Sequence, residues 1–192
     1  MATESLPVYR RLSGMAGLAL PEAGSSMEEV ARRAGWEAVR LNLGFDDLLR
    51  FRRACVLETR SKGQELWSGS RWAVLRGVSE AGVWLQYGAS ALRFVSREEL
   101  EKEWWGSVWV WIPAATGSKK LRPGVRGERV TRLQVALAQL GHWEGYPTGL
   151  YDGSTRKAVA EFQKANGLAA DGRAGPRTMA MLLQLLGEEK VP

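Results

Sequence analysis

The sequence predicts an α+β protein in two domains, a mixed domain over residues 1–113 and a small all-helical domain over residues 121–192. Two observations lead to this division. Residues 54–113 carry short runs rich in Val, Trp, Leu and Tyr between Gly and Ser turns, a pattern typical of strands. In the second domain, apolar residues recur every three or four positions, which is the spacing of helices. The linker at residues 114–120 has the composition of a short exposed connection.

The first part of the mixed domain, residues 6–53, is predicted to consist of helices joined by small-residue turns, with Gly35 at the end of the second helix. Residues 9–18 and 46–51 have helical apolar spacing. Between them, Ser26 and Glu29 form a capping box that begins a further helix.

Five strands are predicted after these helices, at residues 54–59, 72–78, 82–87, 92–95 and 108–113. The second and third are separated by a short turn that ends in glycine, which favours a hairpin. Ser96 and Glu99 form another capping box, which begins a helix that leads into Trp104 and Trp105. We therefore expect helices packed on an antiparallel sheet.

Residues 121–187 repeat one pattern three times: a glycine-marked turn leads into a short amphipathic helix. Asp152 is placed to cap the second helix, and Gly167 followed by Leu168 suits a left-handed helix end. Pro176 fits the first position of the third helix, where its missing N–H costs nothing. None of these helices would be stable alone, so we expect them to share one small core.

The composition is that of a globular protein with a basic surface. Of its 192 residues, 45% are hydrophobic, and 27 Lys and Arg against 21 Asp and Glu give a net charge of +6. This charge favours an acidic partner such as nucleic acid, anionic lipid or cell-wall polymer. The basic residues are scattered and no nucleic-acid recognition motif is present, so we predict no nucleic-acid partner. No apolar run approaches membrane-spanning length and no signal peptide opens the chain, so any targeting segment or anchor is expected outside it.

The single cysteine, Cys55, and the single histidine, His142, limit the chemistry available. Cys55 falls within a predicted strand, where a small buried hydrophobe is its usual role. His142 lies in the other domain, between Gly141 and Trp143, and is interpreted as a turn residue. The sequence therefore predicts no thiol catalysis, no metal site and no cofactor. A pair of carboxylates that cleaves glycan stays open, because such pairs form in space.

The spacing of residues in the helical domain resembles that of the three-helix peptidoglycan-binding domain of bacterial cell-wall enzymes. The resemblance rests on three runs, L-x-x-G-x-x-G-x-x-V-x-x-L-Q from Leu121, G-x-Y-D-x-x-T-x-x-A-V-x-x-F-Q from Gly149, and G-L-x-x-D-G-x-x-G-x-x-T from Gly167. It implies that residues 121–192 bind peptidoglycan.

The order of elements in residues 8–113 resembles the half-barrel of bacterial papain-like peptidases that process bacteriocin leader peptides. In those enzymes a histidine opens a strand of the form H-Y-x-V-L, and here the corresponding run begins with Arg71. The helix that should carry the nucleophile has Ser26 and Met27 and no cysteine. The resemblance therefore implies a degenerate peptidase domain.

This domain followed by a peptidoglycan-binding domain is similar to the periplasmic region of general secretion pathway protein A, the GspA/ExeA family. That resemblance implies a role in installing the secretin channel of type II secretion. It also implies a cytoplasmic ATPase and a membrane span before this region. No P-loop is present here, so ATP hydrolysis is not assigned to this chain.

A peptidoglycan strand offers apolar sugar faces and a stem peptide with carboxylates and amides, so a binding groove needs an aromatic face, hydrogen-bonding side chains and a cation. Six residues on or near the turns meet this need, and they are Trp143, Tyr151, Gln163, Asp171, Arg173 and Thr178. Gly149, Gly172 and Gly175 are expected to shape the turns. The alternative for each is a structural role, as a cap, a core residue or a turn residue.

Four of the nine tryptophans, Trp104, Trp105, Trp109 and Trp111, gather near the last predicted strand. Alternation places Trp109 and Trp111 on one face of the strand and aliphatic residues on the other. Both faces are therefore apolar, and at least one covers something: helices, the second domain or a partner.

We predict a periplasmic, non-catalytic protein that binds peptidoglycan and is tethered to the inner membrane only through a segment outside this chain. Its first domain is expected to act as a docking platform, with secretin or another secretion-system protein as a partner. The alternative is a cell-wall hydrolase or peptidase with an appended peptidoglycan-binding domain.

Overall fold

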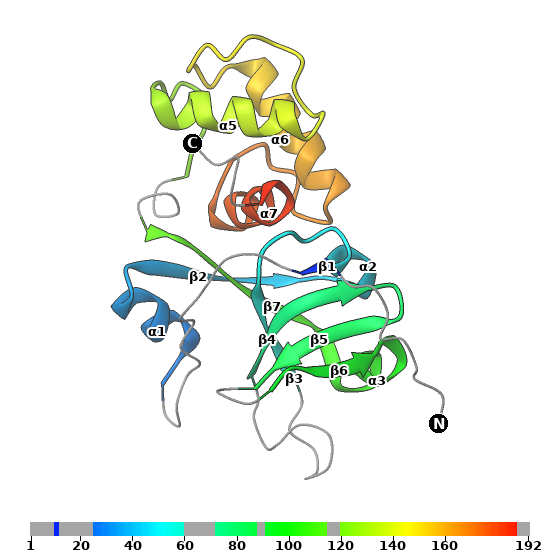
Figure 1. Cartoon of the computed structure of the whole chain (residues 1–192). Coiled ribbons are helices and arrows are strands. Elements are labelled where there is room, and N and C mark those ends of the chain that lie inside the picture. The colour runs from blue at the N-terminus through cyan, green and yellow to red at the C-terminus, as the bar shows by residue number, and fades with distance from the viewer. Residues whose placement is uncertain (1–9, 12–24, 60–71, 88–90, 115–119, 188–192) are drawn as a thin grey trace, which may run out of the picture.

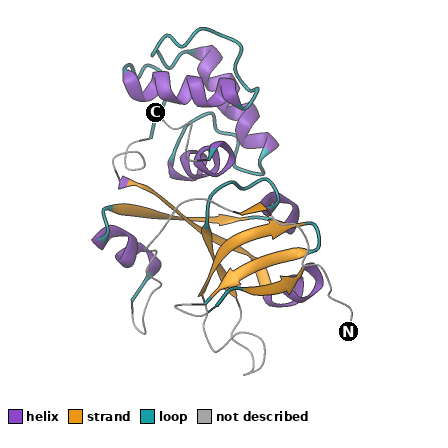
Figure 2. Ribbon diagram, viewed as in Figure 1, coloured by secondary structure: helices purple, strands orange, loops and turns teal. Residues whose placement is uncertain are grey.

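The computed structural model describes residues 10–11, 25–59, 72–87, 91–114 and 120–187. Figure 1 shows a twisted sheet with the helices of the C-terminal part above one end of it, and Figure 2 shows how strands and helices separate into these two parts. The α+β fold class and the all-helical second part are as predicted from the sequence.

The sheet has the strand order β2-β7-β3-β4-β5-β6, with β1 paired to β4, and neighbouring strands are antiparallel. Its strands are β1 (Arg10–Arg11), β2 (Trp36–Asn42), β3 (Cys55–Thr59), β4 (Trp72–Ser79), β5 (Gly82–Gln86), β6 (Arg93–Ser96) and β7 (Trp104–Pro113). The helices of this part are α1 (Met27–Arg33), α2 (Phe45–Leu48) and α3 (Arg97–Glu103). The five predicted strands are present as β3 to β7.

Both predicted serine caps begin helices. Ser26 accepts a hydrogen bond from the backbone N–H of Glu29 at 3.1 Å and caps α1. Ser96 caps α3, where the Glu99 carboxylate also accepts from the backbone N–H of Ser96 at 2.9 Å and completes the capping box.

The prediction of helices joined by turns over residues 6–53 is wrong at residues 10–11, which were expected in a helix, and it missed a strand between the second and third predicted helices. Arg10–Arg11 is strand β1, and Trp36–Asn42 is strand β2, which pairs with β7 along its whole length. In β2 the buried Val39 and Leu41 alternate with exposed Arg40 and Asn42, which is the period of a strand half-covered by a core. The predicted helix at 46–51 is the shorter α2, and residues 12–18 lie outside the described part.

Strand β7 lies between β2 and β3 and is buried on both faces. Trp109 and Trp111 on one face are 8% and 5% exposed, and the aliphatic residues of the other face are buried too. Helix α7 (Pro176–Leu186) packs against β7 and β2, so the helical part supplies part of this cover. Trp104 begins β7 instead of ending a helix, and Trp105 stays 63% exposed.

The helical part consists of α5 (Glu128–Gln139), α6 (Gly153–Ala165) and α7. The Asp152 carboxylate accepts from the backbone N–H of Thr155 at 2.8 Å and caps α6, and Pro176 opens α7, both as predicted. Gly167 is left-handed with φ +65°, and Leu168 N–H donates to the carbonyl of Gln163 at 2.9 Å.

The two parts touch closely. The backbone N–H of Arg52 donates to the carbonyl of Gln184 in α7 at 2.9 Å, and the buried residues of both parts form one contiguous cluster. Residues 115–119 of the predicted linker lie outside the described part, and the boundary at 114–120 stays a prediction.

Candidate functional site

Two glutamines on successive helices hold the turns of the helical part in the same way. Gln134 of α5 is buried, and its amide nitrogen donates to the Leu150 carbonyl at 3.0 Å and to the Thr155 hydroxyl at 2.9 Å. Its amide oxygen accepts from the backbone N–H of Gly149 at 2.9 Å. One side chain thus connects α5, the following turn and the start of α6.

Gln163 of α6 repeats this arrangement one helix later. Its amide nitrogen donates to the Arg173 carbonyl and the Thr178 hydroxyl, both at 3.0 Å, and to the Asp171 carboxylate at 3.1 Å. Its amide oxygen accepts from the backbone N–H of Gly172 at 2.9 Å. Gln163 therefore connects α6, the α6–α7 turn and the start of α7. We call the two arrangements the glutamine latches, Gln134 and Gln163 with their turn partners.

Tyr151 links the two turns to each other. Its side chain is fully buried, and its hydroxyl donates to the Gly172 carbonyl at 2.9 Å. Burial raises the pKa of this phenol to about 12, so it remains a neutral donor at physiological pH. Tyr151, Gln163 and Thr178, all expected at the ligand, are thus bonded to this chain's own groups and hold the shape of the turn surface.

The turns need glycine at two of the three predicted positions. Gly149 and Gly172 have φ values of +68° and +66°, which favour glycine. A Cβ at Gly172 would also lie 2.7 Å from Cγ of Arg156. Gly175 has an extended φ of −92° that other residues adopt, and it serves as the N-cap of α7.

Asp171 and Arg173 are the exposed members of the predicted set beside the second latch. The Asp171 carboxylate accepts from the backbone N–H of Arg173 at 2.9 Å, besides its bond to Gln163. Burial raises the pKa of Asp171, but these hydrogen bonds and the charges of Arg173 and Lys120 outweigh it and lower the pKa below its ordinary value. Asp171 is therefore an anion at neutral pH, with two cations close to it.

These residues line a cleft of about 660 Å³ between the helical part and strand β2. Gln163, Asp171, Arg173, Gly175 and Thr178 lie on its helical wall. The sheet wall includes residues 37–42. The predicted site did not include the sheet wall, because residues 36–42 lie between two predicted helices and were not expected as a strand.

Trp143 lies elsewhere. It lines a separate hollow of about 470 Å³ with His142, Gly145 and residues of α6, and its ring N–H donates to the Gly145 carbonyl at 2.6 Å. The two hollows share no lining residue. Four of the six predicted side chains therefore line one cleft, Tyr151 is buried and bonded to Gly172 of the α6–α7 turn, and Trp143 lies apart.

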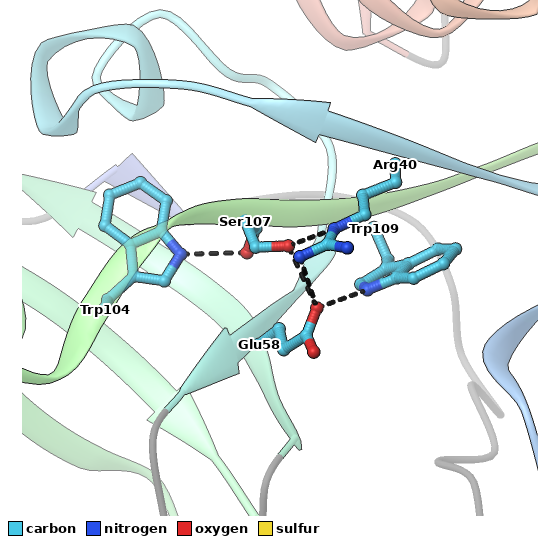
Figure 3. A network of polar contacts seen from close by, with 5 residues as sticks. All are labelled: Arg40, Glu58, Trp104, Ser107 and Trp109. Atoms are coloured by element: carbon cyan, nitrogen blue, oxygen red, sulfur yellow. Dashed lines mark hydrogen bonds and ion pairs between the residues drawn. The ribbon is translucent and has the colours of Figure 1, made fainter.

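The sheet part holds a second polar network, drawn in Figure 3. The Glu58 carboxylate accepts from the Ser107 hydroxyl at 3.0 Å and from the Trp109 ring N–H at 3.3 Å. Arg40 donates to Ser107 at 2.6 Å and lies 3.2 Å from Glu58, and the Trp104 ring N–H donates to the Ser107 carbonyl at 2.8 Å. These bonds tie β2, β7 and β3 together. The Ser107 hydroxyl donates to the Glu58 carboxylate and accepts from the Arg40 guanidinium, so both of its hydrogen bonds hold side chains in place.

Cys55 and His142 lie where the sequence suggested. Cys55 is fully buried in β3, and burial raises the pKa of its thiol, which keeps it protonated. His142 follows the end of α5 and packs edge-on against Phe162, with ring centroids 5.3 Å apart. No group of His, Cys, Asp and Glu side chains suited to a metal ion occurs among the described residues. No helix in the described ranges is long and apolar enough to cross a membrane.

Three short helices, the glutamine latches and a cleft beside the last turn define a small helical module on an α+β protein. In comparison with known proteins, residues 126–182 match the family model described as a putative peptidoglycan binding domain. A zinc D-Ala-D-Ala carboxypeptidase of Streptomyces albus G is 39% identical over 85 residues, which cover 40% of this chain. A probable N-acetylmuramoyl-L-alanine amidase of Bacillus licheniformis is 33% identical over 116 residues, or 57% of this chain. The matches span only 31% of either relative's length.

The fold of most of the chain is shared with a periplasmic domain of the EpsAB fusion protein of the Vibrio vulnificus type II secretion system. The TM-score is 0.51 at 23% identity, over 81% of this chain and 67% of that one. The resemblance inferred from the sequence, an α+β domain followed by a peptidoglycan-binding domain in the manner of the GspA/ExeA periplasmic region, is confirmed at the level of fold and domain.

Proposed function

We propose that this chain is a non-catalytic anchor that binds peptidoglycan in the periplasm and helps to assemble a type II secretion, or secretin, complex across the cell wall. The observation that carries the proposal is the peptidoglycan-binding domain, together with a fold shared with a periplasmic domain of a type II secretion system. In this proposal the helical module holds the wall, and the sheet part is the platform on which a secretion-system protein docks.

Within the module, we assign ligand contact to the exposed side chains and support to the buried ones. Arg173 offers a cation to a stem-peptide carboxylate, and Asp171 offers an acceptor to an amide or amine. Trp143 offers an apolar edge for sugar at the second hollow. Tyr151, Gln163 and Thr178 hold the turn that presents Arg173.

A second candidate is a cell-wall hydrolase, and the observation that favours it is the similarity to a carboxypeptidase and an amidase. The described residues argue for the anchor, because the single cysteine is buried and protonated. The single histidine packs edge-on against Phe162 in the helical part, whereas Ser107 belongs to the sheet network, so the two do not form a serine–histidine pair.

Sedimentation with purified sacculi tests the wall-binding part. The wild-type chain is expected in the pellet, and Arg173→Glu is expected to shift it towards the supernatant, whereas Arg126→Glu, an exposed charge of the module outside both hollows, should not. A wild-type chain that stays in the supernatant would refute the anchor.

Secretin assembly tests the second part. In cells that carry this protein and a type II secretion system, loss of the protein is expected to lower the amount of multimeric secretin in the envelope. Restoring the wild-type protein should recover it, and restoring Arg173→Glu should recover less. Normal secretin multimers without the protein would overturn the assembly role and leave wall binding standing.

A further inference from the structure

The cleft between the two parts follows the edge of a strand. Six consecutive residues of β2, 37–42, line it. Successive side chains of a strand point to opposite faces, so a hollow that touches all six lies along the strand's edge. Strand β2 stands at one end of the sheet's strand order, with β7 on its other side.

An edge strand presents backbone N–H and C=O groups away from its neighbour at every second residue. An extended peptide laid beside such an edge can pair with those groups, which is a common mode of peptide recognition. The volume of about 660 Å³ falls within the range of pockets that hold small ligands. The cleft is therefore shaped for a short extended peptide.

The helical wall of the cleft carries three cations. Lys120, Arg173 and Arg177 line it, all are exposed, and none of them forms an ion pair in the described part of the chain. Two carboxylates, Glu28 and Glu37, line the same cleft from α1 and β2, and they too are without ion pairs among the described residues. The cleft also holds Arg40, which pairs with Glu58. The Asp171 carboxylate lies on the helical wall, accepts from Gln163 and has the charges of Arg173 and Lys120 close to it.

The helical wall therefore carries three cations against one carboxylate, and the two carboxylates without ion pairs in the described ranges line the side formed by α1 and β2. A ligand that matches it is an extended peptide with carboxylates on one side and an amine on the other. A peptidoglycan stem peptide has this chemistry, because it carries free carboxylates and a diamino acid. Glycan fits less well, since the one aromatic side chain in the lining, Trp109, is only 8% exposed.

We infer that the cleft between β2 and the α6–α7 turn is a stem-peptide site built by both parts of the chain. The peptide lies beside β2, its carboxylates meet Lys120, Arg173 and Arg177, and its amine meets Glu28 and Glu37. This inference rests on the proposed function and names the part of the wall that is bound and the second wall of the site. The sheet part then contributes directly to recognition of the wall.

Hydrogen–deuterium exchange of the whole chain with a soluble stem tetrapeptide tests the site. The probe is L-alanyl-γ-D-glutamyl-diaminopimelyl-D-alanine, taken with and without its disaccharide. Slower exchange is expected in residues 37–42 as well as in the α6–α7 turn, because paired edge amides exchange slowly. Protection of the helical turn alone would overturn the two-walled site.

A charge-matched pair of variants gives an independent readout. Lys120→Glu/Arg173→Glu/Arg177→Glu is expected to weaken binding of the tetrapeptide at least tenfold in calorimetry. The control Arg122→Glu/Arg126→Glu/Lys164→Glu changes the net charge equally at exposed positions of the module outside the cleft, and should bind like wild type. Equal losses in both variants would reduce the effect to net charge and overturn the inference.

Sedimentation with sacculi separates this inference from the proposed function. If the wild-type chain binds sacculi but not the tetrapeptide, the stem-peptide site is overturned and the anchor stands. If the chain binds neither sacculi nor the tetrapeptide, both the anchor and the stem-peptide site are overturned. Binding of the tetrapeptide with protection of residues 37–42 supports the site.

Discussion

The helical part and the sheet part each hold a polar network, and the two networks are built differently. In the helical part, the amides of two glutamines bond the turns that follow closely in the chain, mainly through backbone groups and hydroxyls. In the sheet part, a guanidinium, a carboxylate and two indole N–H groups meet across three strands. The first network fixes loops that face outward, and the second fixes a sheet, so the first can shape a binding surface and the second a platform.

Breaking a latch should give the largest effect. Gln163→Ala leaves the Gly172 N–H and the Thr178 hydroxyl without their partners, and buried unsatisfied groups of this kind should lower the free energy of unfolding by about 3 kcal/mol. Urea denaturation followed by circular dichroism measures it. The neighbouring exposed Lys164→Ala is the control and should change little. A loss no larger than that of the control would contradict the latch.

The sheet network should cost less to break. Glu58→Ala removes the acceptor of the Ser107 hydroxyl and the Trp109 indole, and we expect a loss of about 2 kcal/mol in the same assay. Glu58→Gln keeps one acceptor oxygen and should lose less than half of that. Glu80→Ala, in the exposed turn between β4 and β5, is the control. If Glu58→Ala and Glu80→Ala are equally stable, the network does not hold the strands.

The cap of α6 gives a smaller effect that depends on pH. Hydrogen bonds from the Thr155 backbone, the Ser154 hydroxyl and the Thr155 hydroxyl lower the pKa of Asp152. Its folded pKa lies below its unfolded one, so its stabilisation is full above the unfolded value of about 4 and is lost as pH falls through the folded value. Asp152→Ala should lose about 1 kcal/mol at pH 7, and the difference from wild type should shrink in acid.

Asp152→Asn keeps a capping oxygen without the titration, so its difference from wild type at pH 7 should be small. A difference between wild type and Asp152→Ala that stays constant down to pH 2 would contradict the assignment of the carboxylate as the cap.

The smallest effect concerns Cys55 and separates structural from reactive roles. The thiol is fully buried and its pKa is raised, so a disulfide reagent at pH 8 should not react with the folded chain. Unfolding in urea should release one reactive thiol per chain. Reaction of the folded protein at the rate of free cysteine would show that β3 opens, and would reopen thiol chemistry.

The two networks also differ in how far the sequence predicts them. The helix caps at Asp152, Gly167 and Pro176 could be predicted, because each depends on residues within one or two turns. The sequence contains both latch glutamines at regular spacing, but it does not predict their hydrogen bonds, and Gln134 was not predicted as the counterpart of Gln163. The bonds of a buried amide can be assigned only once the conformation of the turn that it holds is known.

The sheet network could not be predicted, since its bonds join residues 49 and 67 positions apart. Strand β2 was missed as well, because its alternation of buried and exposed residues is short and follows a true helix signal at Ser26. Because β2 was not predicted, one wall of the cleft was not predicted either. Trp143 was grouped with Arg173 because spacing does not tell which turns lie side by side.

A single incubation of the whole chain with purified sacculi tests the non-catalytic anchor, with the bound protein measured in the pellet and soluble fragments in the supernatant. For a non-catalytic anchor, we expect most of the chain to sediment with the wall and no muropeptides or free stem peptides to appear above the level without protein. Released fragments would contradict the proposal that the chain is non-catalytic and would make it a cell-wall hydrolase. Absence of the chain from the pellet would contradict the anchor.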